Sequence, residues 1–379
     1  MKKIALIFII IFFTTLCTKQ VEESSGIILI DVDIKTSKET TIETLFSGIE
    51  VIPLETTENS LLKKCGKILF IHNKFFVLDE EQHAIFIFDI QGNFIKNSLH
   101  KEGEGPGEYR SMTDFDINPQ IGNIEILDVS SYKIRRYDEN FNSINETKLP
   151  KKIYPIAAFK IIKSDLLVFY SPQIDSNNER LVFFNTSKNE IIGKIDLQSF
   201  MYRLPTTQRY PFYMKDSYVF FTNRYPNNYI FEILYNEKKI KQIVEYDFGK
   251  NTIRLNDKSE KSLENNSFIE NNKNFVFPLT KYENDSSIFS FVRFKENLHL
   301  VSYNKKSKQT TVVNSKFKDG GMILPPVFID NNYFYILAQP NWVGSIIKKS
   351  LLDKNSQKNI EVLKEDDNPV IIKYKLRTN

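Results

Sequence analysis

Two stretches of similar sequence decide the fold: NKFFVLD at residues 73–79 with AIFIFD at 84–89, and GNIEILD at 122–128 with KIRRYD at 133–138. The second pair follows the first by 49 positions, so that Leu78 returns as Leu127. Each pair consists of two short apolar segments joined by a polar turn. A repeat of short strands at this period is typical of the blades of a β-propeller.

The composition agrees with an all-β fold. The 379 residues suffice for one large domain or two smaller ones, and 41% of them are hydrophobic. Phe and Tyr, at 31 and 18 residues, favour strands because their rings pack on a pleated, half-buried surface. The net charge of +4 falls to about +2 when residues 1–16 are removed, which provides no basic surface for nucleic acid.

The first residues resemble a bacterial lipoprotein signal. Lys2 and Lys3 precede an apolar run over residues 4–16, which is too short to span a membrane as a helix. We therefore expect residues 1–16 to be a signal peptide, Cys17 to carry the lipid and residues 17–26 to form a linker. The small residue usual before the cysteine is replaced by Leu16, and an ordinary signal peptide or an uncleaved anchor remain as alternatives. The expected location is the cell envelope, with the lipid in the outer membrane and the domain facing either the periplasm or the cell surface.

Residues 27–379 divide into units that predict six blades. Their approximate bounds are 61–103, 107–150, 151–199, 205–249, 275–318 and 322–376. A polar stretch at 250–274 predicts a long loop, and a helical period at 344–363 predicts a short helical insertion in the last blade. We expect the ring to close by pairing of N-terminal and C-terminal strands, with an N-terminal strand such as 27–34 completing the last blade.

Three motifs carry a family resemblance: GEGPGEY at 103–109 followed by DFD at 114–116, DDNPVIIKYKL at 366–376, and PLET at 53–56. With them the chain resembles a six-bladed β-propeller family that is abundant in Bacteroidetes lipoproteins and related to NHL-type propellers. The resemblance implies the fold of about residues 27–376. It implies no catalytic residues.

Acidic and glycine-rich positions have structural interpretations beside functional ones. The glycines of 103–107 could present N–H groups to a phosphate, but no Lys-Ser/Thr step follows, so we favour a tight connection between blades. The repeated pairs Asp79/Asp128 and Asp89/Asp138 end strands, where Asp commonly caps turns. Cys65 remains the single thiol if Cys17 is lipidated, and we expect it to be a small buried hydrophobe.

The loops between blades and those joining the second and third strands of a blade lie on one side of a propeller, here called the loop face. They include residues 80–83, 103–110, 130–132, 171–179 and 222–228. Aromatic and Arg side chains there are the types that carry binding energy. Asp114 and Asp116 belong to an inner strand next to the channel. The candidate ligand-binding residues are Tyr109, Arg110, Asp114, Asp116, Tyr132, Arg224 and Trp342.

These features favour a lipid-anchored binding or scaffold protein that binds a protein, peptide or glycan on the loop face. The four histidines are scattered, and the sequence contains no HExxH, CxxC or GxSxG motif, so we predict no catalytic residue, metal ligand or cofactor. The alternative is a hydrolase or lyase that acts on a sugar or lactone with a divalent metal in the central channel. A purely structural envelope subunit is a third hypothesis.

Overall fold

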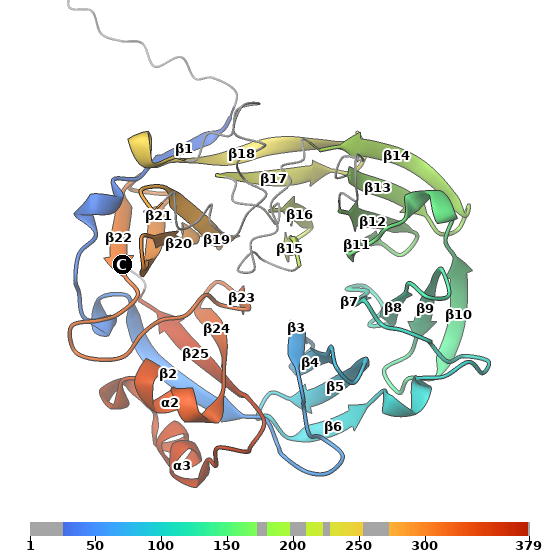
Figure 1. The fold of residues 1–379 in the computed structure, drawn as a ribbon, viewed down its shortest axis with the longest axis horizontal. Helices are drawn as coiled ribbons and strands as arrows, with labels where there is room; N and C mark the ends of the chain where they lie inside the picture. The colour runs from blue at the N-terminus through green and yellow to red at the C-terminus, as the bar shows by residue number, and fades with distance from the viewer. Residues whose placement is uncertain (1–25, 173–179, 198–209, 223–227, 253–272, 378–379) are drawn as a thin grey trace, which may run out of the picture.

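The described strands form six sheets arranged as the blades of a ring (Figure 1). The computed structural model describes residues 26–172, 180–197, 210–222, 228–252 and 273–377. From the channel outward, blade one consists of β3 (Cys65–Ile71), β4 (Lys74–Asp79), β5 (Ala84–Asp89) and β6 (Phe94–Asn97). Blade two consists of β7 (Asp114–Ile117), β8 (Ile124–Asp128), β9 (Lys133–Tyr137) and β10 (Ser143–Lys148). Blade three consists of β11 (Ala158–Lys163), β12 (Leu166–Ser171), β13 (Arg180–Asn185) and β14 (Glu190–Asp196).

The other three blades have the same plan. Blade four consists of β15 (Phe212–Lys215), β16 (Tyr218–Phe221), β17 (Tyr229–Leu234) and β18 (Lys239–Asp247), with β1 (Ile28–Asp31) added outside. Blade five consists of β19 (Val276–Glu283), β20 (Ser287–Phe294), β21 (Asn297–Asn304) and β22 (Thr310–Asn314). Blade six consists of β23 (Phe328–Ile329), β24 (Tyr333–Ala338), β25 (Val370–Leu376) and β2 (Phe46–Pro53). The fold is a six-bladed β-propeller, which confirms the fold class predicted from the sequence.

The repeated aspartates close turns and fasten the connections between blades. Asp89 accepts hydrogen bonds from the backbone N–H groups two and four residues further on, both at 2.9 Å, and Asp138 accepts the matching pair at 2.8 Å. The buried Asp79 carboxylate accepts from four backbone N–H groups, two in the connection before β3 and two in the turn after β4. Asp128 accepts from Arg110 N and Ser131 N at 3.2 Å. The turn role predicted for these aspartates is confirmed.

The hydrophobic core lies between neighbouring blades. Among the described residues it divides into six clusters, one at each junction. The junction of blades one and six shows the geometry: the rings of Phe328 and Tyr335 stack with centroids 4.1 Å apart, and Phe70 lies 5.9 Å from Tyr335. Rings fill the space between two twisted sheets with few rotatable bonds, which accounts for the many phenylalanines.

The ring closes through β2, which pairs antiparallel with β25 in the register Val51 opposite Ile372. The expectation that residues 27–34 complete the last blade is therefore wrong. Their strand β1 pairs in parallel with β18, with Ile30 opposite Tyr246, as a fifth strand of blade four. Between β1 and β2 the chain follows the outer side of blade five, where Lys38 forms a bridge with Val313 (Figure 1). The N-terminal segment thereby covers the exposed edges of three blades, and unpaired edges are otherwise prone to aggregation.

The connection from β24 to β25 contains the helices α2 (Pro340–Ile346) and α3 (Lys354–Val362), as predicted for residues 344–363. Ser356 Oγ of α3 accepts a hydrogen bond from Val51 N at 2.7 Å, and Asn359 Nδ2 donates to Val51 O at 2.9 Å. Thus side chains of α3 provide hydrogen-bond partners for the backbone groups of Val51 on the outer edge of β2. No helix in the described ranges is long and apolar enough to cross a membrane. Cys17 lies outside those ranges, and so do residues 253–272 of the stretch at 250–274 that was predicted as a long loop.

Candidate functional site: the central channel

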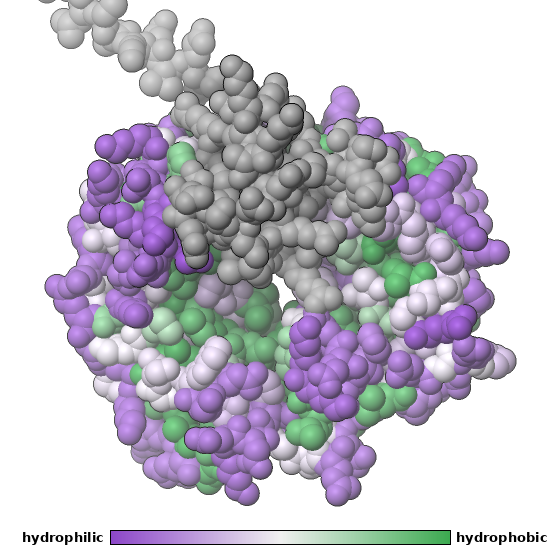
Figure 2. Space-filling view, in the orientation of Figure 1, coloured by the Kyte–Doolittle hydropathy of each residue, from purple (hydrophilic) through white to green (hydrophobic). Residues whose placement is uncertain are grey.

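The innermost strands of the six blades surround a central channel that contains a cavity of about 870 Å³. Most of its lining comes from residues 65–71, 212–215, 279–283 and 328–329, in β3, β15, β19 and β23. The lining side chains are mostly apolar, and Figure 2 shows apolar surface in the hollow near the centre of the face that carries α2. A cavity of this size matches the sites that hold small organic molecules in proteins.

The cavity lies to one side of the channel because β7 and β11 are fastened together. Asp114 Oδ2 accepts a hydrogen bond from Phe159 N at 2.9 Å, and Asp116 Oδ2 accepts from Ile161 N at 2.8 Å. The two side chains of β7 therefore occupy donors along the inner edge of β11. All four residues of β7 are buried, whereas most residues of β3 and all those of β15 are partly exposed.

A lysine neutralises each of these aspartates. Lys67 Nζ lies 2.9 Å from Asp114 Oδ1, and Lys160 Nζ lies 2.7 Å from Asp116 Oδ1. Burial raises the pKa of Asp114 above its ordinary value, and the nearby Lys67 opposes that rise. Asp114 and Asp116 were expected to contact a ligand, but neither side chain has any exposed surface. Their oxygens hold three blades together, and we do not retain them as ligand contacts.

Tyr109 is likewise a structural residue. Its side chain is fully buried, and its hydroxyl donates to the Ser98 carbonyl oxygen at 3.0 Å and lies 2.8 Å from Ser98 Oγ. The ring packs edge-on against Tyr137 at 6.4 Å, and the Tyr137 hydroxyl donates to Gly107 O. The aromatic residue before Arg110 therefore anchors the connection between blades one and two, and a ligand has no access to it.

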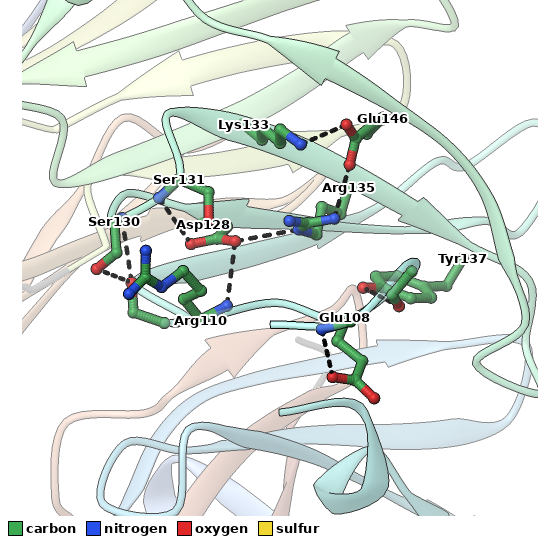
Figure 3. Close-up of polar contacts among 12 residues, drawn as sticks. Glu108, Arg110, Asp128, Ser130, Ser131, Lys133, Arg135, Tyr137 and Glu146 are labelled. Atoms are coloured by element: carbon green, nitrogen blue, oxygen red, sulfur yellow. Dashed lines mark hydrogen bonds and ion pairs between the residues drawn. The ribbon is translucent and has the colours of Figure 1, made fainter. Parts of the chain in front are cut away.

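The glycine loop at 103–107 holds a carboxylate of its own. Glu108 Oε2 accepts a hydrogen bond from Gly105 N at 2.8 Å, as Figure 3 shows. A Cβ atom on Gly103 would lie 2.1 Å from that oxygen, so glycine is required for the carboxylate to fit. The loop thus has the structural role favoured from its sequence, because the Gly105 N–H that a phosphate would need already donates to Glu108.

Arg110 lies at the end of this loop, beside a network that links β8, β9 and β10 (Figure 3). Arg135 Nε donates to Asp128 Oδ2 at 3.0 Å, and its Nη1 donates to Glu146 Oε2 at 2.7 Å. The Arg110 side chain is 54% exposed and pairs with the exposed Glu104 at 2.6 Å. A partner could therefore reach the Arg110 guanidinium, and it stays a proposed contact.

The remaining candidates do not gather at one point in the described ranges. Tyr132 is partly buried and packs against Tyr154, with ring centroids 4.5 Å apart, and its backbone has a φ of +57°. Trp342 is 54% exposed on α2, in the connection between the second and third strands of blade six. Arg224 lies outside the described residues. Tyr132 and Trp342 stay proposals, like Arg110.

Aromatic residues of the inner strands line the cavity, and sequence reasoning missed them. The rings of Phe70 and Phe328 stack at 6.3 Å with planes 11° apart. Tyr213 stacks on Phe220 at 4.9 Å and lies 6.0 Å from Tyr282. No motif marks these residues. The available signal was their place in the first strand of each unit, the strand that borders the channel in a propeller.

Charged groups lie near both ends of the cavity. Near the loop face, Glu80 accepts a hydrogen bond from the Tyr210 hydroxyl at 3.2 Å, and a Cβ on Gly66 would lie 2.5 Å from its Cγ. At the opposite end, Lys215 pairs with Asp285 at 2.9 Å, and Lys305 pairs with Glu283 at 2.9 Å. Burial lowers the pKa of Lys215, but its hydrogen bond to Asp285 and the nearby carboxylates of Glu283, Asp285 and Asp216 together raise it by more, so the net shift is upward and the lysine remains charged at neutral pH.

The cavity shows no reactive thiol or metal-binding group within the described ranges. Cys65 lines the cavity and is partly rather than fully buried. Burial, with smaller contributions from Asp79 and Glu80, raises the pKa of its thiol to about 12, so the nucleophilic thiolate is scarce at neutral pH. No three His, Cys, Asp or Glu side chains in the described part of the chain gather in a way that could hold a metal ion.

A family model described as "Domain of unknown function (DUF4934)" matches residues 26–375. Among solved structures, a Bacteroides fragilis protein described as exported is similar, with 17% identity, a TM-score of 0.72, and coverage of 93% of this chain and 100% of that one. A DUF4221 family member from Bacteroides vulgatus has 11% identity, a TM-score of 0.50, and coverage of 87% and 98%. At these identities the likeness concerns the fold alone. A comparison with curated proteins finds no match.

Proposed function

This chain belongs to the family described as Domain of unknown function (DUF4934), and from that premise we propose that it is a binding protein of the bacterial cell envelope. It is exported, held at the outer membrane by a lipid on Cys17, and captures a protein, peptide or glycan on the loop face around the mouth of the cavity. The exported Bacteroides protein of the same fold supports the expected location.

The observation that carries this proposal is the cavity of about 870 Å³ at the centre of a closed ring. A rigid ring with a preformed hollow binds without first ordering its site, which reduces the entropic cost of association. Arg110 and Trp342 are both exposed in connections of the loop face and are residue types that carry binding energy. A metal-dependent reaction has no comparable support among the described side chains, so we propose binding alone.

The lipid anchor is tested by replacing the cysteine. In cells fractionated into membrane and soluble material, we expect Cys17→Ala to move the protein from the membrane to the soluble fraction. Cys65→Ala removes the other thiol of the chain and should stay with the membrane. Membrane retention of the Cys17→Ala protein would contradict the lipid anchor.

Binding in the cavity is tested with a neutral fluorescent probe, N-phenyl-1-naphthylamine, and the mature chain 17–379 carrying Cys17→Ser. Leu279 lines the cavity at a β-bulge of β19, where the register shifts between Pro278 and Thr280. We expect Leu279→Trp to fill the cavity and to weaken dye binding by about tenfold, since roughly two buried methylene groups' worth of contact is lost. Leu29→Trp, on the exposed outer strand β1, is the matched control. Absence of dye binding, or equal binding by both variants, contradicts a ligand site in the cavity.

A further inference from the structure

We propose that the cavity accepts an apolar group that carries one positive charge, with the charge at the end of the channel away from the loop face. The inference rests on the proposed binding function and deepens it, because it names the chemistry of the group that enters. It is carried by the balance of charges at that end and by the aromatic wall beside it.

Acidic groups exceed basic groups in the three turns that border the cavity at this end of the channel. The turns between the first and second strands of blades four, five and six meet there. The acidic residues here are Asp216, Asp285 and Asp330 in the turns and Glu283 at the end of β19. Two lysines face them, Lys215 and Lys305. Each lysine is paired with one acid, Lys215 with Asp285 and Lys305 with Glu283. Two carboxylates remain beyond those two pairs.

The two remaining carboxylates differ in how they are held. Asp330 accepts hydrogen bonds from the backbone N–H groups of Asn332 and Tyr333 and from the Tyr335 hydroxyl, all at 2.7 Å, so it is fixed in its turn. Asp216 is exposed and has no hydrogen bond or ion pair within the described part of the chain, yet it lines the cavity. Its carboxylate is therefore the one that a bound cation can approach at least cost.

The lysines deeper in the channel do not reverse this preference. Lys67 and Lys160 line the cavity, but each is already paired with a fully buried aspartate of β7. An anion entering the cavity would have to compete with those buried carboxylates, whose own solvation is lost. The lining also includes the aromatic rings of Phe70, Phe328 and Tyr213, and aromatic rings attract cations rather than anions to their faces.

The test compares three probes with the same ten-carbon chain and different charge. Decyltrimethylammonium, 1-decanol and decanoate displace N-phenyl-1-naphthylamine from the mature chain, each below its micelle concentration. We expect the cation to displace the dye most readily, the alcohol to be intermediate, and the anion to need about tenfold more than the cation, because an attraction of about threefold for the cation is matched by a repulsion of about the same size for the anion. Anion displacement equal to or better than that of the cation overturns the inference.

A single variant assigns the preference to this end of the channel. Asp216 has a φ of +53°, a conformation that Asn adopts readily, so Asp216→Asn removes the charge without straining the turn. We expect it to weaken displacement by the cation about threefold and to leave 1-decanol unchanged, a size set by the exposure of the site. Asp366→Asn, at an exposed position before β25, should change neither probe.

The outcomes separate this inference from the proposed function. If the dye binds and Leu279→Trp blocks it, but the three probes displace it equally, the cavity is a binding site without charge preference and only the inference fails. If the dye does not bind, or Leu279→Trp leaves it unaffected, both fail. If Asp216→Asn does not alter displacement by the cation, the positive charge does not lie at the proposed end and the inference is overturned.

Discussion

Replacing Asp116 by Asn tests whether the ion pairs beside the channel hold the ring together. Asp116 has no exposed side-chain surface, and its partner Lys160 is 11% exposed. Asn keeps an oxygen that can accept the hydrogen bond from Ile161 N, which is 2.8 Å long in the native protein. The substitution therefore removes the charge and leaves the shape and that hydrogen bond in place.

The expected cost follows from the lysine left without its partner. Removing one member of a buried ion pair costs about 3–5 kcal/mol. Lys160 also lines the cavity, where water can solvate its ammonium group, so we expect the lower end, about 3 kcal/mol. Asp116→Ala also orphans the Ile161 N–H and should cost about 1–3 kcal/mol more. Native proteins are stable by about 5–15 kcal/mol, so the cost of Asp116→Asn is measurable without abolishing folding outright.

Urea unfolding, followed by circular dichroism at pH 7, measures these costs. The double variant Asp116→Asn with Lys160→Met removes the stranded charge and should recover at least half of the loss, because buried ion pairs are often replaceable by apolar groups. Lys160→Met alone is the control for the change at that position. The reasoning is refuted if Asp116→Asn costs less than about 1 kcal/mol, or if adding Lys160→Met destabilises that variant further.

Three more predictions concern stability and the surface. Burial raises the pKa of Asp79, but hydrogen bonds from Gln82 and from Lys63 and Lys64 lower it by more. The ionised carboxylate therefore stabilises the fold above about pH 4, and this contribution is lost as the pH falls through the lowered pKa. Melting temperatures measured from about pH 7 to pH 3 should thus fall less steeply for Asp79→Asn than for the native protein. Gly92→Ala should lower the free energy of unfolding in urea by about 2 kcal/mol or more, because the residue has a φ of +90° and its Cβ would lie 2.1 Å from Pro53 O. The control Gly249→Ala, with a φ of +58° and open space around it, should lower that free energy by about 1 kcal/mol. Trp342→Ala should change stability by less than about 0.5 kcal/mol, because the ring is exposed, and should weaken capture of a partner on the loop face; unchanged capture would remove Trp342 from the proposed surface.

The blades were predictable because each is a local structure. The strands in 73–89 and 122–138 are short apolar runs because both of their faces are buried against neighbouring blades, and the turns are closed by aspartates a few residues away. The helical insertion followed from its own period. The partner of β1 was not predictable in this way. Its apolar residues suit any outer edge, and its pairing with β18 depends on the path of the chain around blade five.

The candidate site was predicted less well than the fold. Asp114 and Asp116 were placed correctly on an inner strand, but their alternation could not show that β11 lies close enough for both to bond to its backbone. Tyr109 looked like a surface aromatic because its neighbours are Gly, Glu and Arg, yet it is buried against Ser98. Exposure in a loop is set by what packs over it, and the sequence of the loop does not contain that information.

By itself the sequence determined most of the strands, their turns and the number of blades. Each of these depends on residues within about one blade of each other, so their physical causes are written in consecutive positions. Only the tertiary structure decided which inner strands approach one another, where the cavity lies and which charges surround it. Those features arise when six separate units close into a ring, because closure brings together side chains that are far apart in the chain, such as Lys67 with Asp114 and Lys215 with Asp285.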